Sequence, residues 1–140
     1  VLILVVAWMT DTGAYFCGSF FGKHKLCPQI SPKKTVEGAL GGIIVSVLSA
    51  LVTCLVFQNF IFDKQVFINY FLIVLIAVIG AIISMVGDLS FSLVKRSCNI
   101  KDFGNVIPGH GGILDRLDSV IFLSPLIYFL LIVFPVVQNI

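Results

Sequence analysis

The sequence predicts an all-α protein, a polytopic transmembrane bundle of about four helices with a glycine-rich loop before the last span. Of its 140 residues, 59% are hydrophobic and only 11% are charged, whereas soluble domains average about 25% charged residues. The apolar residues form runs long enough to cross a bilayer, and most basic residues fall in two of the loops between these runs. These observations exclude a water-soluble globular domain and a disordered chain.

Each predicted span is an apolar segment near or above the roughly 20 residues that a membrane helix needs. The first span contains Asp11 at membrane depth, and the second has no charged residue. The last span contains Pro125 and Pro135, which would kink a helix unless neighbours satisfy the freed carbonyl groups. The four segments are 1–22, 38–62, 67–85 and 120–137.

The basic residues predict the orientation of the bundle. Eight of the nine lie in the two loops that four spans place on one side of the membrane, and only Lys64 lies on the other side, beside Asp63. Because Lys and Arg accumulate in cytoplasmic loops, we expect a multi-pass plasma (inner) membrane protein whose basic face is cytoplasmic. Basic loops alone indicate topology and no chemistry, and a net charge of +2 is too small to predict nucleic-acid binding.

Six of the seven acidic residues fall on this same face or in the spans that lead to it. A charge at the centre of a membrane helix costs about 2.5–3.5 kcal/mol, so such residues are usually functional. Asp115 and Asp118 are three residues apart and would share a helix face. Asp88, Ser92 and Lys95 would form one stripe if the third helix continues beyond the membrane. For any single Asp, a helix cap or an interhelical ion pair is the alternative.

Two helix ends that carry carboxylates and meet at one membrane surface can hold Mg²⁺. This ion binds one or two carboxylates and leaves its other positions to water and phosphate oxygens. Basic side chains around it would suit a polyphosphate. The basic residues in question are Lys33, Lys34, Lys95, Arg96 and Lys101.

The segment 99–112 contains four glycines and one proline, a composition that favours special backbone angles and close approach to a ligand. Gly111 and Gly112 come just before the last predicted helix, whose free N–H groups would bind an anion. His110 would bind phosphate, donate a proton to it, or only cap the loop.

Three stretches of the chain, SLVKR at 92–96, KDFG at 101–104 and PGHGGILDRLD at 108–118, resemble the signature of the phosphatidate cytidylyltransferases, also called CDP-diacylglycerol synthases. They fit the pattern S-x-x-K-R-x-x-x-x-K-D-x-G-x-x-x-P-x-H-G-G-x-x-D-R-x-D at every fixed position. The upstream segments 11–16, 21–23 and 31–38 are also similar to that family, so the resemblance covers essentially the whole chain.

The resemblance implies an integral membrane transferase that joins CTP to phosphatidic acid with the help of Mg²⁺ and releases CDP-diacylglycerol and pyrophosphate. Members of the family have further N-terminal spans, so residues 1–140 are expected to be the C-terminal catalytic membrane domain. The family also implies a homodimer, with membrane lipid around it and a polar funnel that opens to the cytoplasm.

The resemblance further implies roles for the matched residues. Asp88, Asp115 and Asp118 would hold the metal, while Asp11 would bind a second cation or a substrate hydroxyl. The expected catalytic residues are Lys95, Arg96, Lys101, Asp102, His110, Asp115 and Arg116. The expected substrate-binding residues are Asp11, Ser31, Lys33, Lys34, Ser92, Gly111 and Gly112.

Three other functions compete with this one. A membrane ion transporter or channel would use the same buried carboxylates, but it does not need the basic glycine-rich loop, and the sequence shows no inverted repeat. A CDP-alcohol phosphotransferase would carry a different motif, with which 115–118 does not agree. An inactive membrane scaffold is the fourth possibility.

Overall fold

The structure, a computed structural model, describes residues 1–28, 30–60, 66–98, 100, 114–134 and 136–139. Four α-helices and four short β-strands follow one another in it. The elements are α1 Leu2–Phe21, β1 Lys25–Cys27, β2 Ser31–Thr35, α2 Val36–Phe60, β3 Val66–Ile68, α3 Tyr70–Ser97, α4 Leu114–Val133 and β4 Val137–Asn139. The prediction of a helical membrane bundle is confirmed, and the strands are an addition to it.

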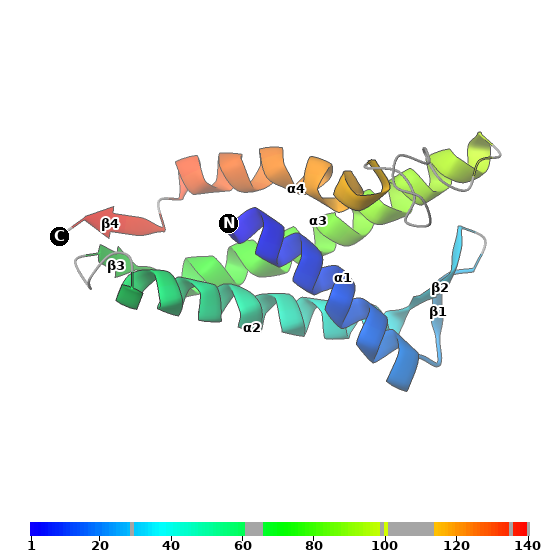
Figure 1. The fold of residues 1–140 in the computed structure, drawn as a ribbon, viewed down its shortest axis with the longest axis horizontal. Helices are drawn as coiled ribbons and strands as arrows, with labels where there is room; N and C mark the ends of the chain where they lie inside the picture. The colour runs from blue at the N-terminus through cyan, green and yellow to red at the C-terminus, as the bar shows by residue number, and fades with distance from the viewer. Residues whose placement is uncertain (29, 61–65, 99, 101–113, 135, 140) are drawn as a thin grey trace.

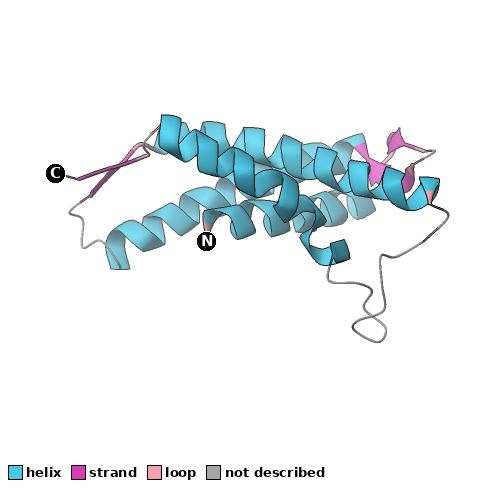
Figure 2. Cartoon of the chain, turned by 90° about the horizontal axis from the view of Figure 1, so that it is seen from above, coloured by secondary structure: helices cyan, strands magenta, loops and turns pink. Residues whose placement is uncertain are grey.

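The four helices form one elongated bundle with a small antiparallel strand pair at each end (Figure 1). β1 pairs with β2 at the end where α1 and α3 finish, and β3 pairs with β4 at the opposite end. The view from above shows the same two pairs at opposite ends of the helices (Figure 2). β3 and β4 therefore lie together at the end of the bundle opposite β1 and β2.

The third helix differs most from its prediction. It begins later than expected because β3 occupies Val66–Ile68, and the Asn69 side chain caps the helix by accepting the Leu72 N–H at 3.3 Å. It ends at Ser97, well beyond the predicted end at residue 85. Lys95 and Arg96 lie in its last turn, where positive charge favours the helix C-terminus. The run of apolar residues in the sequence indicated only the membrane-spanning part of this longer helix.

Three of the helices, α1, α2 and α3, are long and apolar enough to cross a membrane. The apolar part of α4, Ser119–Val133, is shorter, so the predicted fourth span at 120–137 is too long at its C-terminal end. The helix ends at Val133. Because the residue before a proline is disfavoured in a helix, Pro135 explains why the helix ends there. Asp11 does not interrupt α1.

Glycines bring α1 and α2 into close contact. A Cβ atom added at Gly42 would lie 2.7 Å from the Thr10 carbonyl oxygen, and one at Gly38 would lie 2.6 Å from the Ala14 carbonyl oxygen. Gly13 faces α2 in the same way, with its added Cβ 2.7 Å from the Cβ of Val45. Small residues allow this backbone approach in membrane bundles.

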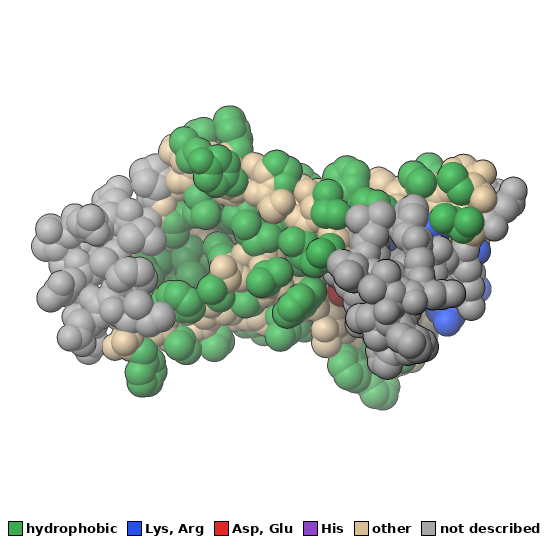
Figure 3. All heavy atoms as spheres, turned by 45° about the horizontal axis from the view of Figure 1, so that its top comes forward, with side chains coloured by type: hydrophobic (Ala, Val, Ile, Leu, Met, Phe, Trp, Pro, Cys, Tyr) green, Lys and Arg blue, Asp and Glu red, His purple; other side chains and the backbone are tan. Residues whose placement is uncertain are grey.

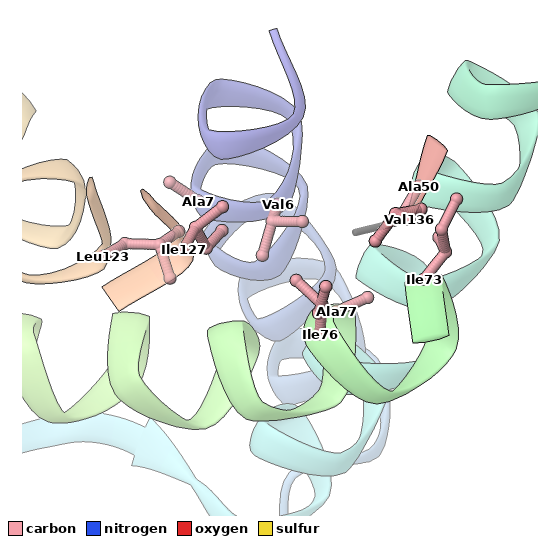
Figure 4. Close-up of a cluster of buried hydrophobic side chains, with 9 residues drawn as sticks. All are labelled: Val6, Ala7, Ala50, Ile73, Ile76, Ala77, Leu123, Ile127 and Val136. Atoms are coloured by element: carbon pink, nitrogen blue, oxygen red, sulfur yellow. The ribbon is translucent and has the colours of Figure 1, made fainter. Parts of the chain in front are cut away.

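The buried core lies on the β3–β4 side of the polar residues described below. Val6 and Ala7 of α1 meet Ile76 and Ala77 of α3 and Leu123 of α4 (Figure 4). In each of these helices the core residues are separated from the polar residue, Asp11, Asp88 or Ser119, by one or more turns. The core therefore lies next to the polar residues, on the side that faces β3 and β4. Ala50, Ile73, Ile127 and Val136 complete this cluster.

Many large apolar side chains of the described residues are exposed. Leu40, Ile44, Leu48 and Val52 form an exposed stripe at intervals of four residues on α2, and hydrophobic side chains dominate the described part of the face in Figure 3, with Lys and Arg at one end. An exposed apolar surface of this extent fits a protein surrounded by lipid. The chain is a membrane protein.

Replacement of Gly42 by Leu is expected to lower the free energy of unfolding by about 1–3 kcal/mol, as overpacking does. Leu is the better helix former, so any loss must come from the forced separation of α1 and α2. The measurement is thermal unfolding of the purified protein in detergent. Leu48→Phe adds volume to the exposed face of α2 and serves as the control. An unchanged midpoint for Gly42→Leu would show that the close contact is absent.

Candidate functional site

A cavity of about 230 Å³ opens at the end of the bundle that carries β1 and β2. It is unusual in this apolar protein because two acids and two lysines line it. Asp11 comes from α1, Lys33 and Lys34 come from β2, and Asp88 comes from α3. Charged groups of both signs that converge in one cavity favour a charged ligand.

Four polar side chains connect in a chain at this cavity. Lys34 Nζ donates to Asp88 Oδ2 at 2.9 Å and forms an ion pair with it. The hydroxyl of Ser119 lies 2.6 Å from Asp88 Oδ1 and 3.1 Å from Asp11 Oδ2. The side chains of Lys34 and Asp88 are 29% and 19% exposed, so the pair is screened from water only in part.

A local clamp positions the strand pair that carries the two lysines. The Glu37 carboxylate accepts the backbone N–H groups of Lys23 and His24 at 3.2 Å, and its Oε1 lies 2.7 Å from His24 Nδ1. The Val36 N–H donates to the His24 carbonyl at 2.9 Å, and the Thr35 hydroxyl accepts the Gly38 N–H at the start of α2. These contacts fix β2 beside the cavity.

The structure brings together five of the residues that the sequence singled out. The cavity is lined by Asp11, Ser31, Lys33, Lys34 and Asp88. They come from three elements that are distant along the chain. Their chemical roles stay predictions.

Ser92, Lys95 and Arg96 follow Asp88 on the same helix and do not line the cavity. The helix is continuous through them, so Asp88, Ser92 and Lys95 share one stripe as predicted. Lys101, Asp102, His110, Gly111 and Gly112 lie outside the described residues. Asp115, Arg116 and Asp118 lie in the first two turns of α4, of which the structure describes the backbone but not these side chains.

The sequence put Ser119 on the helix face of Asp115 but gave it no role in the site. Ser119 is 2% exposed, and its contact with Asp11 spans 108 residues. The only signal for it was its position one helical turn after Asp115. Tyr15, Thr35 and Met85 also line the cavity. Tyr15 and Thr35 fall in the segments 11–16 and 31–38 that resemble the family, whereas no pattern in the sequence distinguishes Met85 from its apolar neighbours.

The described oxygen atoms fit a hard divalent cation. Asp11 and Asp88 reach one hydroxyl from two helices, and Mg²⁺ binds through one or two carboxylates, with phosphate and water in the remaining positions. Among the described side chains, no cluster of three or more His, Cys, Asp or Glu residues is present. A fuller set of carboxylates would need Asp115 or Asp118 from the first turns of α4.

A second cavity, of about 280 Å³, lies near the β3–β4 end. Phe57, Ile73 and Leu131 are among its lining residues, and none of the described residues that line it is an acid, a lysine or an arginine. The described lining therefore offers no charged side chain to a nucleotide or a phosphate.

Comparison with known proteins relates the chain to one enzyme family. A sequence model described as the cytidylyltransferase family matches residues 1–134. The phosphatidate cytidylyltransferase of Bacillus subtilis is 49% identical over 130 residues, which are 93% of this chain and 46% of that protein. The proteins of the same name from Staphylococcus haemolyticus and Staphylococcus aureus are 48% and 44% identical over 128 residues, 91% of this chain and 46% of each protein. The chain thus spans about half the length of these relatives.

Proposed function

This chain belongs to the cytidylyltransferase family, and we therefore propose that the whole protein transfers the cytidylyl group of CTP to phosphatidic acid. The products are CDP-diacylglycerol and pyrophosphate, and the reaction serves phospholipid biosynthesis. Residues 1–140 act in this proposal as the C-terminal catalytic membrane domain. The relatives named above carry the name of this activity, and none of them is named as a transporter or channel, so that alternative gains no support.

The observation that carries the proposal is the charged cavity at one end of an apolar bundle. Lys33 and Lys34 of β2 line this cavity together with Asp11 of α1 and Asp88 of α3. A phospholipid keeps its tails in the bilayer and its phosphate at the surface, so both substrates can meet at such a cavity. Ammonium groups attract the phosphates, and the carboxylates offer ligands for a cation.

The chemistry needs no nucleophile from the protein. A phosphate oxygen of phosphatidic acid attacks the α-phosphorus of CTP and forms a new P–O bond. The bond between the α-phosphorus and the bridging oxygen to the β-phosphorus breaks, and pyrophosphate leaves with that electron pair. Such transfers depend mainly on positioning and on stabilisation of charge. In this proposal Lys33 and Lys34, which line the cavity, neutralise the phosphates, and Lys95, Arg96 and Lys101 act on the leaving pyrophosphate.

We propose Mg²⁺ as the cofactor. Asp88 would hold it together with Asp115 and Asp118, and Asp11 would bind a second cation or a substrate hydroxyl. When bound, the ion neutralises phosphate oxygens and aligns them for transfer. The support from the described residues is the convergence of Asp11 and Asp88 on Ser119.

The proposed orientation places the cavity on the cytoplasmic side of the plasma (inner) membrane. The basic residues at the ends of α1 and α3 and in β1 and β2 support this side. CTP would then reach the cavity directly from the cytoplasm. A homodimer stays a prediction that rests on the resemblance of the sequence.

The direct test uses the full-length protein, purified in detergent, with CTP and phosphatidic acid. We expect CDP-diacylglycerol only when both substrates and a divalent cation are present. Diacylglycerol in place of phosphatidic acid removes the attacking phosphate and should give no lipid product. Absence of product from the complete mixture would refute the proposed function. Cation flux into vesicles without lipid product would favour a transporter instead.

A further inference from the structure

We propose that Ser119 is a positioning residue, which sets the separation and orientation of Asp11 and Asp88 and holds the start of α4 against α3. The inference rests on the proposed function, because it assigns Ser119 to the same site. Its starting point is the hydroxyl of Ser119, which contacts carboxylates from two other helices at 2.6 and 3.1 Å.

Ser119 differs from most serine and threonine hydroxyl groups described in the helices, which bond within their own helix. Thr10, Ser49 and Thr53 donate to the carbonyl four residues earlier in their own helix, at 2.6–2.8 Å. Ser46 is fully buried and also donates within its own helix, to the Ile43 carbonyl. Such bonds connect nothing beyond one turn. The Ser119 hydroxyl instead joins α4 to α1 and α3 at a position that is 2% exposed.

The hydrogen bond from the Ser119 hydroxyl fixes the orientation of the Asp88 carboxylate. Asp88 Oδ1 faces Ser119, and Asp88 Oδ2 faces Lys34. With both oxygens engaged, rotation of the carboxylate would break one of two charge-assisted hydrogen bonds, which are the stronger kind. Loss of the Ser119 hydroxyl would free one oxygen and leave Lys34 as the one described partner.

The close packing of α3 and α4 next to Ser119 allows its hydroxyl to contact Asp88. A Cβ atom added at Gly87 would lie 3.1 Å from the Phe122 Cβ, so α3 and α4 are in tight contact one residue before Asp88. The rings of Phe91 and Phe122 meet edge to face at 5.9 Å one turn further along α3. Ser119 lies one turn before Phe122 on α4 and one turn after Asp115. It therefore links the turn that carries Asp115 to Asp88.

Residues that orient metal or substrate ligands typically contribute 10–100-fold to affinity or activity. In the full-length protein we expect Ser119→Ala to lower kcat/KM for CTP about 10–100-fold. It should also raise the Mg²⁺ concentration that gives half the maximal rate, because the carboxylates lose their fixed separation. Ser119→Thr keeps the hydroxyl and should recover most of the activity. Ser46→Ala removes an equally buried hydroxyl and should behave like the wild type.

A second measurement needs no turnover. It records the rise in thermal unfolding temperature when MgCl₂ alone is added to the full-length wild type and to Ser119→Ala. We expect a smaller rise in the variant. Wild-type kinetics and Mg²⁺ dependence in Ser119→Ala would overturn the proposal, and so would a lower unfolding temperature with an unchanged Mg²⁺ response. If the wild type makes no CDP-diacylglycerol, the proposed function fails. Equal Mg²⁺-induced rises in the two proteins would then overturn the role of Ser119 as well.

Discussion

Replacement of Asp88 by Asn will lower the rate of CDP-diacylglycerol formation by about 10³-fold, the size of effect seen when a preorganised charge-stabilising group is removed from an active site. Asn has nearly the same shape as Asp, so it can still accept the Ser119 hydroxyl. It cannot neutralise Lys34, which contacts Asp88 at 2.9 Å in the native protein. It is also a much weaker ligand for a divalent cation, because it carries no charge.

The measurement for Asp88→Asn is the initial rate of lipid-product formation by the full-length variant in detergent, over a range of Mg²⁺ concentrations. Asp63→Asn is the matched control, because Asp63 is the one acid that the sequence places on the opposite side of the membrane. We expect that control to be as active as the wild type. Turnover within a few fold of wild type in Asp88→Asn would remove Asp88 from the site.

Replacement of Asp115 by Asn is expected to abolish activity, again by about 10³-fold or more, without loss of membrane insertion. Asp115 lies in the first turn of α4. It shares a helix face with Ser119, which contacts Asp88 of α3. Its place in the signature-like stretch 108–118 implies a metal ligand. The variant should insert normally because a neutral side chain is easier to bury than a charged one.

The test of Asp115→Asn combines the lipid-product assay with a membrane fractionation and a thermal unfolding curve. Asp115→Glu is the informative companion, since it keeps the charge but moves it outward by one methylene group. We expect Glu to retain more activity than Asn. An Asn variant that turns over like the wild type would exclude Asp115 from catalysis. A variant found outside the membrane fraction would show that Asp115 acts in assembly.

Much of the bundle followed from the sequence because long apolar helices are set by local composition. α1 and α2 agree with their predicted segments to within about two residues at each described end. The prediction differed from the structure at the ends of helices, where the apolar pattern alone does not mark the boundary. α3 runs to Ser97, with Lys95 and Arg96 in its last turn, and α4 ends at Val133, two residues before Pro135. The strand pair β1–β2 has three- and five-residue strands, too short for an alternating pattern to indicate.

The site was predictable in its residues but not in its connections. Asp11, Lys34 and Asp88 stood out because charge is rare in this chain. Nothing in the sequence says that the Lys34 ammonium pairs with Asp88, 54 residues away, or that Ser119 reaches Asp11 across 108 residues. Those contacts depend on how closely the helices approach, and the glycines at 13, 42 and 87 allow close contacts between neighbouring helices.

The most direct test of the central claim follows the phosphorus atoms of CTP. Full-length protein with phosphatidic acid and Mg²⁺ is given CTP labelled at the α-phosphorus in one reaction and at the γ-phosphorus in another. Cytidylyl transfer predicts that the α label appears in CDP-diacylglycerol and that the γ label appears only in pyrophosphate. Label from the γ position in the lipid, or no labelled lipid from either CTP, would contradict the assignment of this cavity to cytidylyl transfer.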